Sequence, residues 1–433
     1  MSSAATGGSI GLLRNREFLA LAGTAFARAQ AYSTVLIALA LYAEQFDTTG
    51  TVEGLFGTAF ALAQLVIVLP LGRYIDIGNS KRYLLAGLVL NVLVFVGFSL
   101  VGSVEHVILV RVVQGIGASL LWLTGSAVVG EISPADERGH WLGVYNQVGA
   151  FSSLAGDIFG GLLLYVYGFQ VAYAALIVIT MVAFVLVLAY LRDEPGGRKD
   201  PEEATGIETL RRLLGRTAIR ALVLFRVSFS VGKMAVIIFL PIYARTAFGI
   251  NPLAIGGILA GGKLTKSALQ GYVGALNDRS DDPYLFILGG AVLYALGTIL
   301  VPYAEVAHRV FPTVTLASPV SAASMTLPPA FFSLFLAYAV LGVGDSVRLP
   351  ASMSLFVEEG EHFDAVAGSM SLRSIAWKLG QVSGPVLVGA IWDATSVFVA
   401  FAVAAGALLL SALVFAVLFS VDPAPGGAPA AGD

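Results

Sequence analysis

Long apolar stretches, separated by short polar turns, follow one another along almost the whole chain. Each holds about 20 residues or more, the length a helix needs to cross the ~30 Å hydrocarbon core of a bilayer. Strands of a membrane barrel would instead alternate apolar and polar residues over ~10 positions. The pattern therefore predicts twelve membrane-spanning helices, at residues 17–43, 52–74, 82–103, 105–130, 139–165, 168–191, 217–246, 252–275, 283–303, 329–357, 364–391 and 394–421.

The longer polar segments divide the chain into two halves. Thr205 and Glu208 have the spacing of a capping box, which predicts a short amphipathic helix on the inner membrane surface. The last residues are rich in proline, glycine and alanine, typical of a segment without a packed core. We expect an N-terminal segment at 1–16, a six-helix bundle at 17–191, a linker at 192–216, a second bundle at 217–421 and a tail at 422–433.

Short sequences recur between the two halves at nearly constant spacing. Gly72 and Asp76 recur as Gly274 and Asp278, 202 residues later, in turns between apolar stretches. A Gly-Ile-Gly at 115–117 recurs as Gly-Val-Gly at 342–344, 227 residues later. The wider spacing indicates an insertion in the second half, which we place in an outer loop at 304–328. Two halves in one orientation are typical of parallel repeats in transporters.

Composition supports a membrane protein: 57% of the 433 residues are hydrophobic and 12% are charged. A soluble domain would carry about 25% charged residues. The chain has no cysteine, which excludes disulfides and thiolate chemistry. Its four histidines do not pair at metal-ligand spacing, and its glycine-rich pieces lack the Lys-Ser ending of a phosphate loop. We therefore expect no enzyme, no metal, no cofactor and no nucleic-acid partner.

Lysine and arginine are distributed unequally between the two sets of loops. The side opposite the predicted termini holds two, Arg245 and Arg309. Because cytoplasmic loops carry the excess of positive residues, we expect both termini inside a cytoplasmic (inner) membrane. The other side holds fourteen: Arg14, Arg16, Arg73, Lys81, Arg82, Arg138, Arg192, Arg198, Lys199, Arg211, Arg212, Arg216, Arg220 and Arg279.

Charged residues within the predicted spans are mostly positive. Two acids, Asp157 and Asp345, fall well inside. A charge inside a bilayer is costly unless it faces water, a partner or a ligand. Two acids cannot neutralise the nine bases within the spans. The excess positive charge therefore indicates other partners, which are an anionic substrate, backbone carbonyls or water in a cavity. The nine bases are Arg28, Arg111, Arg226, Lys233, Lys263, Lys266, Arg348, Arg373 and Lys378.

Depth along the helices, at ~1.5 Å per residue, suggests two ion pairs. Asp345 lies level with Lys378 on neighbouring spans, and Asp157 lies level with Lys263 on the eighth span. Such pairs have two interpretations. They stabilise the fold without taking part in transport, or a carboxylate that changes between protonated and paired states couples ion flow to the transport cycle.

Three motifs resemble those of the major facilitator superfamily. They are the turn from Gly72 to Arg82, the Arg111-Val-Val-Gln114-Gly sequence of the fourth span, and the acidic, proline-containing turn from Gly130 to Gly139. The second motif is prominent in proton-coupled members, and the content is closest to the drug:proton antiporter-like branch. Exporters of the family often have Gly-Pro in the fifth span, where this chain has Asp157; the second half keeps Pro385.

The resemblance implies an all-α fold of two pseudo-symmetric six-helix bundles, with spans one, four, seven and ten around a central cavity. For substrate binding it favours Arg28, Arg111, Gln114, Arg226, Lys233 and Arg348. For coupling or gating, the charged residues inside the spans and their depths favour Asp157, Lys263, Lys266, Asp345 and Lys378. For a latch between conformations the resemblance favours Gly72, Asp76, Arg82, Asp278 and Arg279.

The function we expect is a secondary active transporter for a small organic anion or polar metabolite. Transport would proceed by alternating access, coupled to protons or sodium, in a monomer. A proton-coupled multidrug exporter is the alternative within this class, weakened by Asp157. A membrane binding or scaffold protein that does not transport is the alternative from another class.

Overall fold

The structure is a computed structural model that describes residues 11–134, 137–194, 207–277, 279–280, 282–317, 324–363 and 365–421. Almost all of them are helical. The first half contains η1 (Gly11–Arg14), α1 (Arg16–Gln45), α2 (Gly50–Ile77), α3 (Ser80–Ser99), α4 (Val104–Ile132), α5 (Arg138–Ala155), η2 (Gly156–Gly160) and α6 (Gly161–Tyr190). Then follow α7 (Ile207–Leu214), α8 (Thr217–Thr246), α9 (Pro252–Asn277), α10 (Pro283–Leu300), η4 (Pro302–Arg309), β1 (Val314–Ala317), β2 (Ser324–Leu327), α11 (Pro329–Glu361), α12 (Val366–Ala394) and α13 (Val397–Val421).

The described residues contain twelve membrane-length segments, as predicted. By length and apolar composition alone, eight helices qualify as spans within the described residues, or nine if the bent pair of α10 and η4 counts as one. One of the eight, Arg138–Tyr190, contains two segments, because Gly168 breaks it with a left-handed φ of 72°. Dividing this segment at Gly168 gives nine spans. With α9, α10 and α12, which occupy equivalent places in the bundle, the number is twelve.

Local sequence explains several helix ends. The side chain of Asn15 accepts hydrogen bonds from the backbone of Glu17 and Phe18, and Asn79 caps α3 in the same way. Such caps satisfy N–H groups that have no partner within the helix. Proline opens α10 and α11, where its missing N–H and fixed φ are tolerated.

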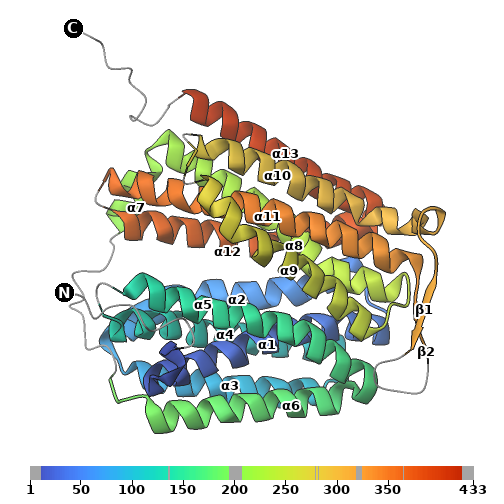
Figure 1. Ribbon diagram of the computed structural model, residues 1–433, viewed down its shortest axis with the longest axis horizontal. Coiled ribbons are helices and arrows are strands. Elements are labelled where there is room, and N and C mark those ends of the chain that lie inside the picture. The colour runs from blue at the N-terminus through green and yellow to red at the C-terminus, as the bar shows by residue number, and fades with distance from the viewer. Residues whose placement is uncertain are drawn as a thin grey trace.

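The helices form two bundles side by side, α1–α6 and α8–α13 (Figure 1). α1 and α8 are central. In the most apolar 18-residue stretch of each helix, 78% of the residues of α1 and 61% of those of α8 are buried within the protein. For α3 and α13 the share is 39%, which leaves one face of each for lipid. The two halves predicted from the repeats are therefore separate bundles, with the most buried helix of each half at the centre.

The bundles pack closely at one end and separate at the other. One apolar core, which includes Ile37, Phe56 and Tyr243, runs through both halves. A second core around Phe18 and Trp141 belongs to the first half alone. In Figure 1 the bundles diverge toward the side that holds α7 and approach each other toward β1 and β2. The molecule is thus closed at the β1–β2 end.

Equivalent glycines of the two halves make equivalent contacts at the closed end. Gly54 of α2 lies against the carbonyl of Pro385 in α12, and Gly256 of α9 lies against the carbonyl of Asp157 in η2. Neither position has room for a Cβ, so glycine permits this close approach of backbones. Gly54 and Gly256 keep the 202-residue spacing of the repeat. These contacts also give Asp157 in the first half the position that Pro385 has in the second half.

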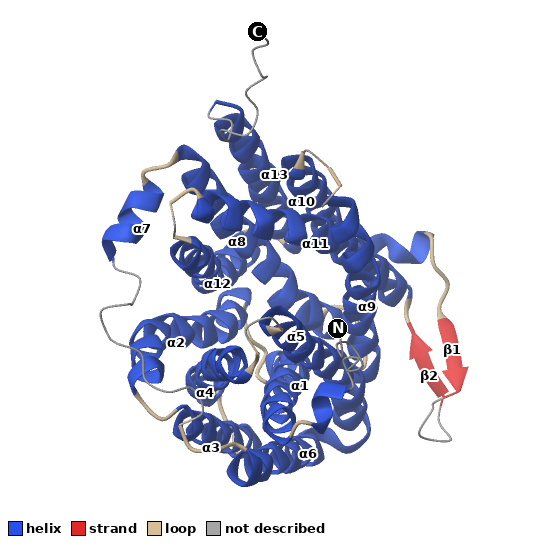
Figure 2. Ribbon diagram, turned by 60° about the vertical axis from the view of Figure 1, so that its left-hand side comes forward, coloured by secondary structure: helices blue, strands red, loops and turns tan. Residues whose placement is uncertain are grey.

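The segment predicted as an insertion contains a helix and a hairpin. After α10 the chain forms η4, and β1 then pairs antiparallel with β2, with Val314 opposite Leu327. Residues 318–323 of this segment lie outside the described residues. Figure 2 shows the hairpin extending from the bundle, on the side away from α7.

The helix predicted in the linker is α7, and its apolar side packs on the protein. Leu213 is buried with Ile219, Ala365 and Leu372. Arg212 lies over the ring of Phe363, with 5.6 Å between the guanidinium carbon and the ring centroid. The rest of the linker, 195–206, and the predicted segments 1–10 and 422–433 lie outside the described residues.

Candidate functional site

Three cationic side chains converge on Asp345 of α11. Lys233 Nζ of α8 lies 2.7 Å from Asp345 Oδ2, and Lys266 Nζ of α9 lies 2.6 Å from the same oxygen. Arg348, one helical turn after Asp345, donates from Nη2 to Oδ1 at 2.8 Å. Asp345 and Arg348 are almost completely buried. Three helices of the second half thus place three positive charges around one carboxylate.

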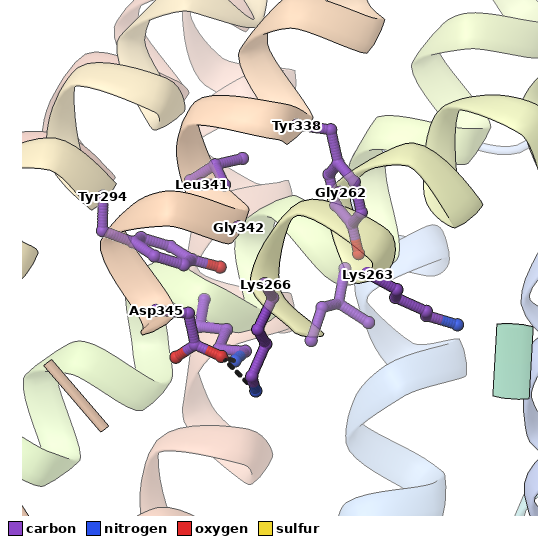
Figure 3. A pocket seen from close by; sticks show the side chains of 10 residues that line it. Gly262, Lys263, Lys266, Tyr294, Tyr338, Leu341, Gly342 and Asp345 are labelled. Carbon is purple, nitrogen blue, oxygen red and sulfur yellow. Dashed lines mark hydrogen bonds and ion pairs between the residues drawn. The ribbon is translucent and has the colours of Figure 1, made fainter. Parts of the chain in front are cut away.

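A cavity of about 170 Å³ lies beside this cluster. Its polar lining includes Lys233, Lys263, Lys266 and Asp345, and the rings of Tyr294 and Tyr338 complete the wall. Figure 3 shows Lys266 extending to Asp345, whereas Lys263 extends in another direction from the same helix. The cavity is therefore lined by cations from α8 and α9, with a single carboxylate from α11.

Aromatic rings support two neighbouring arginines. The guanidinium carbon of Arg348 lies 3.7 Å from the centroid of Phe229, and that of Arg226 lies 4.5 Å from the centroid of Trp377. A cation over a ring face is stabilised electrostatically. Arg226 also interacts electrostatically with Arg348, Arg373 and Asp345. The positive charge predicted for this region is therefore concentrated around Asp345 in the second half.

The predicted pair of Asp157 and Lys263 is present, and it joins the two halves. Lys263 Nζ lies 2.6 Å from Asp157 Oδ2, donates to Ser33 Oγ at 3.0 Å and to Ser153 Oγ at 2.8 Å. Asp157 is fully buried. It belongs to η2, a π-helical turn inside the fifth span. Turns of this type occur frequently at functional sites.

The predicted pair of Asp345 and Lys378 is wrong. Lys378 Nζ instead donates a hydrogen bond to Gln64 Oε1 of α2, in the other half. Lys378 also interacts electrostatically with Arg28. Depth along a helix does not specify which side of α12 carries Lys378. The side chain of Lys378 contacts α2. The partners of Asp345 come instead from α8, α9 and α11.

Arg111 and Gln114 connect two helices of the first half. Arg111 donates from Nε to the carbonyl of Phe56 at 2.8 Å and from Nη1 to Gln114 Oε1 at 2.6 Å. Its guanidinium carbon lies 4.4 Å from the ring centroid of Phe60. Arg111 is fully buried, which rules out the alternative that it extends to the outer interface. These contacts fix α4 against α2.

The remaining predicted site residues are distributed over the molecule. Arg28 has a buried Nε without a hydrogen-bond partner among the described residues. Arg82 lies beside Asn79 and Tyr83 at the turn between α2 and α3, and Arg279 is exposed. Gly72 and Asp76 belong to the last part of α2, but the Asp76 side chain is outside the described part of the chain, as is Asp278.

Several residues at these sites were missed from the sequence. Tyr294 and Tyr338 line the cavity wall, but aromatic residues are common in membrane helices, so nothing in the sequence distinguishes these two. Ser33 and Ser153 bear no charge that would mark them. A further bond between the halves was also missed: Asp393 of α12 accepts from the backbone N–H groups of Gly50 and Thr51, at 2.6 and 2.8 Å.

Metal binding finds no support in the part of the chain that the structure describes. No three of its His, Cys, Asp and Glu residues are grouped in a way that could hold a metal ion. The side chains around the cavity suit a different ligand, since ammonium groups donate hydrogen bonds and do not ligate cations.

Comparisons with known proteins agree with this architecture. Residues 21–318 match the family model described as Major Facilitator Superfamily. An uncharacterised MFS-type transporter, MJ1560, of Methanocaldococcus jannaschii is 21% identical over 82% of this chain and 86% of its own length. The multidrug resistance protein MdtG of Citrobacter koseri is 24% identical over 90% of this chain and 91% of its own.

Solved structures share the fold at low sequence identity. The peptide transporter POT in complex with sulfate is 14% identical, covers 96% of this chain and 98% of its own, and has a TM-score of 0.71. An inward-facing, unoccupied bacterial homologue of the human lysosomal transporter Spinster is 14% identical over 94% of this chain and 95% of its own, with a TM-score of 0.67. The helix arrangement, the repeats and the family match together show that the chain belongs to the Major Facilitator Superfamily of membrane transporters.

Proposed function

We propose that this transporter moves a small organic anion or polar metabolite. The observation that carries the proposal is the convergence of Lys233, Lys266 and Arg348 on the single carboxylate of Asp345, beside a cavity. One carboxylate cannot neutralise three cations, and unbalanced charge within a membrane is costly. An anionic substrate would supply the missing negative charge and would thus be attracted to the cavity.

Transport would proceed by alternating access, with the two bundles rocking around the cavity. The shared apolar core and the bonds from Asp393 support a molecule closed at the β1–β2 end. The excess of lysine and arginine on the other side supports a cytoplasmic position for that open end. We therefore assign an inward-facing state in a cytoplasmic membrane, with both termini inside and the protein active as a monomer.

The pair of Asp157 and Lys263 is our candidate for ion coupling. It spans the two halves and borders the cavity through Lys263, so a change in the charge of Asp157 would reach both the interface and the site. A proton on Asp157 would leave Lys263 without its counter-ion and would weaken the contact between the halves. Sodium would act by competing with Lys263 for the carboxylate. Asp76, Arg82, Asp278 and Arg279 remain candidates for the latch, and Asp76→Asn tests that role through turnover.

Transport by purified protein in proteoliposomes tests the proposed function. Labelled carboxylates are offered with an imposed proton or sodium gradient, and accumulation above protein-free liposomes is the expected result. Arg348→Gln is the matched variant, because it removes one cation from the cluster, and it should reduce accumulation. Binding of carboxylates without either accumulation or exchange would support the scaffold alternative.

A proton-coupled multidrug exporter is the second candidate. The similarity to MdtG over most of both chains supports it, as does the Arg111 and Gln114 motif of the fourth span. Asp157 in place of the exporter proline argues against it. Efflux of a lipophilic cation that anionic competitors do not inhibit would favour the exporter over the anion transporter.

A further inference from the structure

We propose that the cavity between α8, α9 and α11 binds a small organic dianion, either a dicarboxylate or a phosphate monoester. This inference rests on the proposed function and narrows its substrate class. Three features carry it: the number of uncompensated charges at the cavity, the number of hydrogen-bond donors that remain free there, and the cavity volume.

The charges at the cavity leave two positive groups without a counter-ion. Four cations contribute: Lys233, Lys263 and Lys266 line the wall, and Arg348 binds Asp345 from behind. Two carboxylates oppose them, Asp345 for three of the cations and Asp157 for Lys263. A monoanion would leave one positive charge unbalanced, whereas a dianion neutralises the set. Arg226 and Arg373, which interact electrostatically with Arg348, add further positive potential.

Donor groups remain for a ligand on Lys233 and Lys266. An ammonium group has three N–H donors. Lys263 donates to Ser33 and Ser153, and its charge is paired with Asp157. Lys233 and Lys266 each donate to Asp345 Oδ2, which leaves two donors on each for ligand oxygens. The hydroxyls of the lining Tyr294 and Tyr338 can donate as well. One acidic group of the ligand would bind between the two lysines, and the other would meet the tyrosines.

Cavity size limits the ligand to a small molecule. The volume is about 170 Å³. A cavity of ~150 Å³ holds a molecule of the size of benzene, so this one accepts roughly six to eight non-hydrogen atoms. Four-carbon dicarboxylates and small phosphate monoesters are of that size. Large lipophilic cations would be too large for this cavity and would be repelled by its lysines.

Binding to the purified full-length protein, measured by calorimetry, tests the inference with matched ligands. Succinate is compared with butyrate, its monoanionic analogue, and ethyl phosphate is compared with ethanol. We expect each dianion to bind at least ~10-fold more tightly than its partner, and the ranking of the two dianions identifies the preferred acidic group. Butyrate binding as tightly as succinate, with no preference for ethyl phosphate over ethanol, would overturn the proposal.

Two variants distinguish the cavity from general surface charge. Lys266→Gln removes one of the two uncompensated charges, so the preference for succinate over butyrate should fall to nearly one while butyrate still binds. Arg309→Gln removes an exposed charge of η4 that does not line the cavity, and it should leave the preference unchanged. An undiminished preference in Lys266→Gln would contradict the assignment of the site. If proteoliposomes accumulate monoanions without preference for dianions, the proposed function stands and only this inference fails.

Discussion

Asp157 Oδ2 and Lys263 Nζ lie 2.6 Å apart and belong to different halves of the molecule. The aspartate occupies a π-helical turn of the fifth span, and the lysine reaches it from α9. The carbonyl of Asp157 also lies against Gly256 of α9, so backbone and side chain of one residue both contact the opposite half. Any motion that separates the halves here must break both contacts.

Asp157→Asn should abolish gradient-driven accumulation while substrate exchange continues. The change removes the negative charge but keeps the shape, so Lys263 loses its counter-ion and keeps its hydrogen bonds to Ser33 and Ser153. Without a carboxylate that can take up an ion, the conformational cycle would no longer depend on the gradient. Accumulation and counterflow in proteoliposomes measure the two activities separately.

A purely structural role for this pair gives a different result. Removing one partner of a buried ion pair costs ~3–5 kcal/mol, and removing both usually costs less. Asp157→Asn would then lower the free energy of unfolding, and adding Lys263→Met would restore much of it. Asp157→Pro introduces the residue of the second half. Full gradient-driven transport in Asp157→Pro would exclude a coupling role.

The apolar pattern predicted the helices well, because each span needs about 20 apolar residues whatever its neighbours are. Counting depth also placed Asp157 level with Lys263. The same count failed for Asp345 and Lys378, because it leaves the rotation of each helix about its axis undefined. Lys378 faces Gln64 in the other half, and Lys233 and Lys266, from more distant spans, reach Asp345.

Neutral site residues could not be found in the sequence for a related reason. Ser33, Ser153, Tyr294 and Tyr338 occur in apolar helices among many residues of the same types. Only the three-dimensional arrangement shows that two of them bind Lys263 and the other two line the cavity. Charged residues can be recognised as candidates in the sequence because burying a charge in a membrane costs much free energy, so such residues are rare there. Burying a hydroxyl group costs less, so serine and tyrosine are common in the spans and do not stand out.

Arg111→Ala should reduce stability more than it reduces substrate affinity. Arg111 binds the Phe56 carbonyl and Gln114, and its guanidinium covers the ring of Phe60, all within the first half. Losing a buried, charge-assisted set of bonds should cost ~2–3 kcal/mol. Thermal unfolding of the purified protein and ligand titration measure the two effects. Lys266→Gln is the comparison, and it should change affinity more than stability. A large loss of affinity in Arg111→Ala, with normal unfolding, would place Arg111 at the substrate.

Single cysteines should establish the orientation of the protein. The chain has no native cysteine, so each introduced thiol reports one position. His140 and Thr315 are exposed at opposite ends of the bundle. We expect a membrane-impermeant maleimide to label Thr315→Cys from outside intact cells, and His140→Cys only after the membrane is opened. Ala38→Cys, which is buried, is the control and should stay unlabelled. Labelling of both exposed sites from one side would contradict the twelve-helix topology.

Asp393→Ala should shift the molecule away from the state closed at the β1–β2 end. Asp393 belongs to α12, yet it accepts hydrogen bonds from Gly50 and Thr51 at the start of α2, in the other half. Thr49, the residue before α2, makes no capping hydrogen bond with its side chain. Asp393 therefore caps the N-terminus of α2 from the other half. Losing a helix cap costs ~1 kcal/mol, which corresponds to roughly a five-fold change in the balance of two states.

Spin labels at the exposed residues Leu100 and Phe398, one in each half near the closed end, report that balance for Asp393→Ala. We expect a longer-distance population to appear, and to grow when Glu44→Gln is added, because Glu44 and Arg245 form a second ion pair between the halves, at 2.6 Å. Thr395→Ala is the matched control, since the Thr395 hydroxyl, directly after α12, donates to the carbonyl of Ile391 within the same half. Unchanged distances in both variants, or an equal shift in Thr395→Ala, would show that the bonds from Asp393 do not hold this end closed.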